Sequence, residues 1–329
     1  MNRKQRLHNK IGRSVATLPL CALLAVALWW LPQGHYSLDY AVGLVLTLLT
    51  AYVIAETNNS NMLIRTRSRM ISSVWIFGAA CIGLLHPFSP ALLASFCLAV
   101  SYYLLFRSYQ KPEPVVDAFH SLFMLSLGSI VVPKMIYLAP VFVWHLGVFM
   151  QAITLRTFFA ALVGALLPFW FWAGWQMWEG DLAPMVAWLR DVQSVPWVWL
   201  RPFDETLAPT LPHIVFLALA VFSLWSAVSY LFHSFDDKIR TRMMLYVYVF
   251  QTLLLVLFGC LTATDDMLFC LLPLLLLSAS PLLAHYFTLS NTWFSLIFFL
   301  LFVLTAAFIG MLTLVPTLLP EALSFTLLV

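Results

Sequence analysis

The chain has 329 residues, of which 62% are hydrophobic and only 9% are charged, and its formal net charge at pH 7 is +3. Soluble domains carry roughly 25% charged residues, so this chain lacks the polar surface that a protein needs in water. The composition excludes an ordinary soluble domain and indicates a protein that lies within a membrane.

Long apolar runs follow one another along the whole chain. About 20 apolar residues cross the hydrocarbon core as a helix, because every backbone polar group there must bond within its own segment. The sequence therefore predicts an all-α, polytopic transmembrane helix bundle of about 11 spans, within a range of about 10 to 12. The predicted spans are 15–32, 38–55, 70–86, 91–106, 117–132, 135–152, 157–178, 213–232, 243–263, 267–287 and 293–314.

The basic residues fall almost entirely into every second gap between these spans. Of the 17 Lys and Arg residues, 14 lie on the side of the N-terminus, and only Lys134, Arg190 and Arg201 lie on the other. Basic residues that flank spans stay in the cytoplasm. We therefore expect a single integral-membrane domain, 1–329, with its N-terminus inside, its C-terminus outside and an external interfacial segment at 179–212.

The weakest predicted span is 117–132. His120, Ser126, Gly128 and Ser129 dilute its apolar character, and it ends before Pro133. A broken helix or re-entrant pair over 117–152 is the alternative, because irregular backbone is tolerated at membrane depth where protein or a water-filled cavity covers it. Two full spans are the favoured prediction.

His145 and Gln151 form a candidate intramembrane polar site. His145 lies near the middle of the span 135–152, and Gln151 follows it by two helical turns. An ionisable side chain at that depth is a functional candidate, because its burial costs a few kcal/mol on insertion scales. The alternative, which we favour, is a neutral histidine that bonds a neighbouring helix.

Lys134, Arg190 and Arg201 are the candidate residues for binding an anion or a lipid phosphate. They are the three basic residues predicted outside, and Arg side chains bind phosphate through two parallel hydrogen bonds. Lys134 has two alternatives: it extends to the membrane surface without a partner, or it pairs with Asp265 or Asp266 at the outer end of a later span.

The external segment also gathers Trp188, Trp197 and Trp199, which either form an interfacial belt or stack on sugar rings. In the second interpretation a carboxylate or imidazole would act as general base. The candidates for that base are Asp204, Glu205 and His213. The recurrence of Met185, Trp188 and Leu189, with Pro184 in a first turn, predicts a short helix lying flat on the outer surface.

The segment 104–175 contains Phe106-Arg107-Ser108-Tyr109-Gln110, the Arg156-Thr157-Phe158 span entry and the spacing from Gly164 to Pro168. On these features the chain resembles a family of uncharacterised multi-pass membrane proteins from Bacteroidetes. The resemblance implies the inner membrane of a diderm bacterium and no particular activity.

The five cysteines lie in apolar segments without metal-ligand spacing, and no Gly-rich phosphate loop or zinc motif is present. We expect no cofactor and no metal; the expected partners are membrane lipids and a lipid-linked glycan, and not nucleic acid. Three functions stay open. A role in envelope or polyprenyl-linked glycan processing at the outer face ranks first, and the alternatives are a small-solute or proton-coupled transporter and a structural subunit of a membrane complex.

Overall fold

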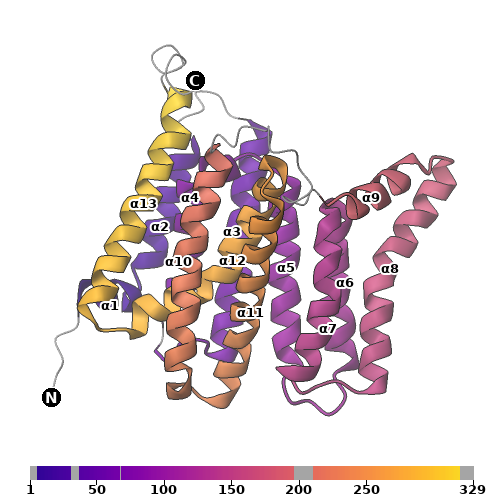
Figure 1. Ribbon diagram of the computed structural model, residues 1–329, viewed down its shortest axis with the longest axis horizontal. Helices are drawn as coiled ribbons and strands as arrows, with labels where there is room; N and C mark the ends of the chain where they lie inside the picture. The colour runs from indigo at the N-terminus through magenta and orange to yellow at the C-terminus, as the bar shows by residue number, and fades with distance from the viewer. Residues whose placement is uncertain (1–5, 31–36, 67, 196–209, 319–329) are drawn as a thin grey trace.

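A computed structural model shows the chain as a bundle of helices (Figure 1). It describes residues 6–30, 37–66, 68–195 and 210–318, and within these ranges the chain forms thirteen α-helices and no strand, which confirms the all-α class. The α-helices are α1 (Leu7–Arg13), α2 (Thr17–Trp30), α3 (Leu38–Asn61), α4 (Met70–Cys81), α5 (Pro90–Arg107), α6 (Val115–Val131), α7 (Leu138–Val148), α8 (Leu155–Glu179), α9 (Ala183–Gln193), α10 (Leu211–His233), α11 (Ile239–Thr262), α12 (Asp265–Leu289) and α13 (Trp293–Leu318). Short 3-10 turns lie at η1 (Gly83–Leu85), η2 (Pro133–Tyr137) and η4 (Ser234–Asp236).

Seven of the described helices are long and apolar enough to cross a bilayer: α3, α5, α8, α10, α11, α12 and α13. Their apolar stretches have 18 to 26 residues, and a helix rises about 1.5 Å per residue, so each reaches about the thickness of the hydrocarbon core. Helices α1 and α2 meet at 88° and together would make an eighth candidate. The chain is therefore a multi-pass membrane protein, whereas the total of about 11 spans stays a prediction.

The segment 117–152 forms helices that are shorter than the predicted spans. Helix α6 has 17 residues and α7 has 11, and η2 joins them. Figure 1 shows α7 beside α6. Pro133 is the first residue of η2, where its fixed φ and missing N–H are tolerated.

Helix α12 forms the centre of the bundle. Nearly all of its residues are buried, against α4, α5, α10 and α11, and its apolar side chains point to every side, as expected of an enclosed helix. Pro273 and Pro281 lie inside it, and each proline deprives the carbonyl four residues earlier of its helical partner. At mid-length the Ser278 hydroxyl lies 3.2 Å from the Tyr102 hydroxyl of α5.

Helix α8 forms one edge of the bundle, opposite α13 (Figure 1). Its outward side chains are large and exposed, among them Trp170 at 77% and Trp178 at 88%, a surface suited to lipid. On its inner side α8 touches the backbone of α6, because a Cβ added at Gly164 would lie 2.3 Å from the Phe119 carbonyl oxygen.

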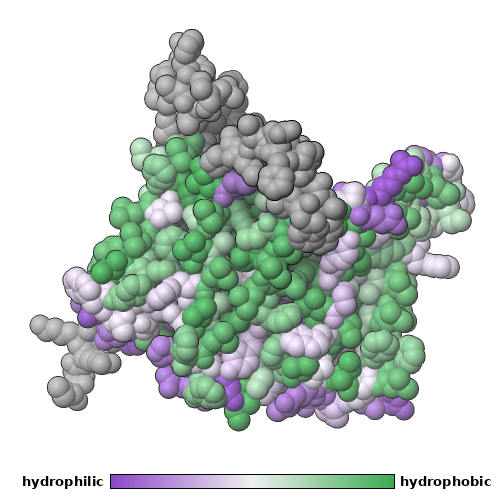
Figure 2. Space-filling view, in the orientation of Figure 1, coloured by the Kyte–Doolittle hydropathy of each residue, from purple (hydrophilic) through white to green (hydrophobic). Residues whose placement is uncertain are grey.

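The bundle has two ends, which we name by the helix that lies at each: the α1 end and the α9 end (Figure 1). Eleven of the thirteen basic residues that the structure describes lie at the α1 end, and the other two are Lys134 and Arg190. Figure 2 shows the same division on one face, where apolar residues cover the helices and hydrophilic residues collect along the α1 end and around α9.

Candidate functional site: an apolar cavity near the α9 end

A cavity of about 530 Å³ lies between η2, α7, α11 and α12 near the α9 end. Its wall is mostly aliphatic. Binding sites for small molecules usually enclose roughly 300–1,000 Å³ and carry a few polar groups in an apolar wall, so the cavity has the size and lining of such a site. Its aliphatic residues include Leu138, Val141, Leu254, Leu257, Leu271 and Leu274.

Lys134 and Asp191 form an ion pair in the wall of this cavity. The Lys134 ammonium donates to Asp191 Oδ1 over 2.7 Å. The Lys134 side chain is 14% exposed and that of Asp191 is 45% exposed. Both alternatives for Lys134, a side chain without a partner and a pair with Asp265 or Asp266, are therefore wrong, because α9 folds back over η2 and brings the Asp191 carboxylate to it.

Three contacts fix α9 on the rest of the bundle. Besides the Lys134–Asp191 pair, the Trp188 indole N–H donates to the Ser129 carbonyl over 2.8 Å, and the Tyr137 hydroxyl donates to the Val192 carbonyl over 2.6 Å. The Trp188 ring also packs against Phe169 at 4.8 Å. The predicted short helix is confirmed as α9, whereas its position flat on the outer membrane surface stays a prediction. Trp188 anchors this helix and is not free to stack on a ligand.

Of the other two anion candidates, Arg190 lies within the described residues and Arg201 does not. Arg190 precedes Asp191 on α9, is exposed, and forms no ion pair with any residue that the structure describes. Arg201 lies outside the described residues, as do Trp197, Trp199, Asp204 and Glu205. Of the proposed anion site, the structure thus places Lys134, which pairs with Asp191, and Arg190, which precedes Asp191 on α9.

His213 belongs to a polar cluster at the same end of the bundle. Its Nδ1 lies 2.6 Å from the Thr210 hydroxyl and 3.0 Å from Asp265 Oδ1, and its Nε2 lies 3.1 Å from the Ala263 carbonyl. Thr210 also donates to Asp265. Since Leu261 and Met267 line the cavity, the α11–α12 turn that carries Ala263 and Asp265 adjoins it. This cluster holds His213 in place beside the α11–α12 turn, with a partner on each ring nitrogen.

His145 and Gln251 lie just beyond the inner end of the cavity. Val141 and Leu138 line the cavity one and two turns from His145 on α7, and Leu254 does so one turn from Gln251 on α11, so they share helix faces with these two polar residues. Both polar side chains are 0% exposed, and the ring nitrogens of His145 and the amide atoms of Gln251 have no hydrogen-bond partner among the described residues. His145 thus does not bond a neighbouring helix as we had favoured; its ring packs on aromatic rings such as Phe250, 5.5 Å away.

Gln151 does not join His145 in a polar site. It follows the end of α7 with a φ of 52°, and its side chain is exposed. Its Oε1 accepts a hydrogen bond from the Gln110 amide over 3.2 Å, beyond the end of α5. The predicted pairing fails because α7 ends at Val148, so that the chain has left the helix before Gln151.

Sequence reasoning missed a charged cluster at the α1 end. The Asp237 side chain is fully buried, and its two oxygens lie 2.8 Å from Arg65 Nε and 2.8 Å from His285 Nε2. The Tyr230 ring packs edge-on against His285 at 4.8 Å, and its hydroxyl has no hydrogen-bond partner in the described part of the chain. The cluster connects the α3–α4 segment, the α10–α11 turn and the last turns of α12.

A weak signal for this cluster was present in the chain. His285 is another histidine inside a predicted span, and Asp236-Asp237 stands in a gap whose other charged residues are basic. Asp237 and His285 are 48 residues apart in the sequence, and this spacing does not by itself predict that they are in contact. The pairing follows only from the way α12 packs behind α10 and α11.

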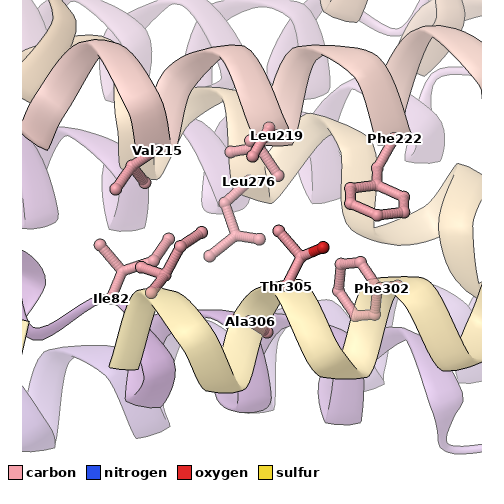
Figure 3. A pocket seen from close by; sticks show the side chains of 11 residues that line it. Ile82, Val215, Leu219, Phe222, Leu276, Phe302, Thr305 and Ala306 are labelled. Atoms are coloured by element: carbon pink, nitrogen blue, oxygen red, sulfur yellow. The ribbon is translucent and has the colours of Figure 1, made fainter. Parts of the chain in front are cut away.

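A second, smaller hollow lies between α4, α10, α12 and α13. Figure 3 shows side chains of α10, such as Val215 and Phe222, facing those of α13, such as Phe302 and Thr305. The space measures about 30 Å³, far below the roughly 300–1,000 Å³ of small-molecule binding sites. It is a packing gap with no room for a substrate. Among the described residues no group of three or more His, Cys, Asp or Glu side chains could hold a metal ion.

Comparison with known proteins adds no relative. No protein-family model, no curated protein and no solved structure matches this chain. The function must therefore be argued from the geometry of the sites.

Proposed function

We propose that this protein is an inner-membrane protein that binds a lipid-linked glycan at its outer face, as part of envelope glycan processing. The observation that carries the proposal is the aliphatic cavity of about 530 Å³ with the Lys134–Asp191 pair in its wall. A lipid chain placed among Leu138, Val141 and Leu254 would bring its head group to that pair.

The polar groups favour a glycosylated head group over a bare phosphate. Asp191 compensates the charge of Lys134 at 2.7 Å, so a phosphate would have to compete with a carboxylate. A sugar hydroxyl both donates and accepts, and it can bond Lys134 and Asp191 without separating them. The lipid phosphate would then face Arg190, whose guanidinium has no ion partner among the described residues.

The division of charge supports the orientation that this proposal requires. Eleven of the thirteen described basic residues lie at the α1 end, and basic flanks stay in the cytoplasm, so the cavity would face outward. If the shorter helices α2, α4, α6 and α7 also cross, the total reaches the predicted value of about 11. Membership of the Bacteroidetes family that the sequence resembles belongs to this same proposal.

The test is retention of polyprenyl-phosphate lipid and of its glycosylated form by purified protein, measured by native mass spectrometry. Lys134→Met should reduce retention of the glycosylated lipid by at least about tenfold, since a charge-assisted hydrogen bond contributes about 1.5–3 kcal/mol. Lys111→Met is the matched control, because Lys111 pairs with Asp117 at 2.6 Å at the opposite end. Equal retention by wild type, Lys134→Met and Lys111→Met would remove the proposal.

A proton-coupled transporter is the second candidate, and His145 and Gln251 favour it. Polar atoms without partners beside a cavity at membrane depth are typical of ion and proton pathways, and the prolines of α12 resemble the interrupted helices of transporters. Proton uptake into proteoliposomes, followed with an enclosed pH-sensitive dye, tests this candidate. His145→Phe should abolish uptake at unchanged protein level, and a wild-type protein without uptake would exclude proton coupling.

A further inference from the structure

An open groove of about 610 Å³ lies on the surface between α6 and α8, at the α1 end of the bundle. The two helices lie side by side, and both begin at this end (Figure 1). Arg156 lines the groove from the first turn of α8, and Val163 lines it seven residues further along that helix. Seven helical residues rise about 10 Å, so the groove reaches from the end of the bundle into its apolar length.

The groove is charged at one end and apolar along the rest of its wall. Arg156 lies at the charged end. The lining residues other than Arg156 and His120 are apolar: Val115, Val116, Phe119, Phe159, Ala160 and Val163. Val116, Phe159 and Val163 are each at least half exposed. A charged end at the start of two membrane helices, followed by an apolar wall, matches the order of head group and acyl chain in a phospholipid.

Basic side chains outnumber acidic ones around the charged end. An oxygen of Asp117 lies 2.6 Å from Lys111 Nζ, and its other oxygen lies 3.4 Å from Arg107 Nε, so two cations share one carboxylate. Arg156 lies 3.0 Å from Glu113. Three cations therefore face two carboxylates, and these five side chains carry a net charge of +1. Basic pockets between membrane helices favour anionic lipid head groups.

Arg156 can bind an anion without leaving Glu113. The Arg156 side chain is 75% exposed and that of Glu113 is 51% exposed, and exposed pairs of this kind are weak. A guanidinium has five N–H donors, of which Nη1 donates to Glu113. His120 adds an acceptor. Its Nδ1 donates to the Val116 carbonyl over 2.8 Å, which leaves Nε2, unpartnered among the described residues, to accept from a hydroxyl.

We propose that this groove binds an anionic phospholipid, with its phosphate on Arg156 and part of one acyl chain along Phe159 and Val163. A glycerol head group suits the site, because its phosphate carries the charge and its hydroxyls can donate to His120. An apolar helix of another protein would leave the surplus positive charge uncompensated. The groove shares no lining residue with the cavity near the α9 end, so the proposal does not rest on the proposed function.

Native mass spectrometry of the purified full-length protein tests the site. The probe is an equimolar mixture of phosphatidylglycerol and phosphatidylcholine with identical acyl chains. Arg156→Gln removes the charge, and Arg13→Gln is its control, because Arg13 is an exposed cation at the same end that does not line the groove. Val163→Trp fills the groove. Leu162→Trp is the matched control, because Leu162 is 44% exposed and lies outside the groove.

Wild type should retain phosphatidylglycerol in preference to phosphatidylcholine. Arg156→Gln should reduce phosphatidylglycerol retention about fivefold, the usual contribution of one basic residue near an anionic lipid surface, and Val163→Trp should abolish the preference. Arg13→Gln and Leu162→Trp should bind as wild type does. The proposal is overturned if wild type shows no preference, or if either variant binds like its control. A wild-type dimer that Val163→Trp alone dissociates would also overturn it, since the groove would then be an interface between two copies.

Discussion

Removing one partner from the Arg65–Asp237–His285 cluster should have an effect that depends on which partner is removed. The Asp237 side chain is 0% exposed and that of Arg65 is 44% exposed. Arg65→Gln leaves a buried carboxylate with only His285 beside it, and breaking a buried pair in this way costs about 3–5 kcal/mol. Asp237→Asn leaves a cation that can turn to water and keeps an oxygen near His285, so we expect a cost of about 1–2 kcal/mol.

Reversible unfolding in mixed detergent micelles measures the free energy of unfolding of wild type, the two single variants and the double variant. The double variant Arg65→Gln, Asp237→Asn should lose clearly less free energy of unfolding than the sum of the two single losses, because the arginine no longer matters once the carboxylate is gone. Couplings of this kind reach about 0.5–3 kcal/mol. Arg156→Gln, at an exposed pair with Glu113, should cost less than about 1 kcal/mol. Equal losses for Arg65→Gln and Asp237→Asn, or strict additivity, would refute the reasoning.

Three further outcomes follow from the structure. Gly164→Ala should lower the free energy of unfolding by about 1–3 kcal/mol, since the added Cβ would meet the Phe119 carbonyl at 2.3 Å, whereas Gly174→Ala, with nothing within 4 Å, should be neutral or stabilising in the same assay. In α1, burial lowers the pKa of His8 below its usual value of 6.5. As the pH drops below about 6.5, the unfolded chain therefore takes up a proton at His8 before the folded protein does, and the free energy of unfolding should fall. His8→Gln should flatten this part of the plot of unfolding temperature against pH. Cys270 lies in the cavity wall. In delipidated protein whose other cysteines are replaced, it should react with a small maleimide, and added polyprenyl lipid should slow this reaction. If lipid leaves the labelling rate unchanged, the lipid binds elsewhere.

Local patterns in the sequence were enough to predict the fold class and α9. A long apolar run predicts a helix buried in lipid or protein, whichever segments pack against it. The spacing of Met185, Trp188 and Leu189 likewise predicts a short helix with one apolar face. Lengths were less predictable. Helix α7 ends at Val148, although the apolar run continues, because the chain turns to enter α8.

The sites depended on contacts between distant parts of the chain. Lys134 was a candidate from its position, but its partner Asp191 lies 57 residues away and reaches it only because α9 folds back. The cavity itself has no sequence signature, since Leu254 and Val141 resemble any other lipid-facing residues.

Filling the cavity tests the central claim most directly. Leu254 lines the cavity, whereas the adjacent Leu253 is 39% exposed and does not, so Leu254→Trp and Leu253→Trp add the same side chain inside and outside it. Native mass spectrometry of the two purified variants with glycosylated polyprenyl-phosphate lipid is the measurement. We predict that Leu254→Trp loses the bound lipid while Leu253→Trp keeps it at the wild-type level; equal lipid binding by both variants would contradict the account.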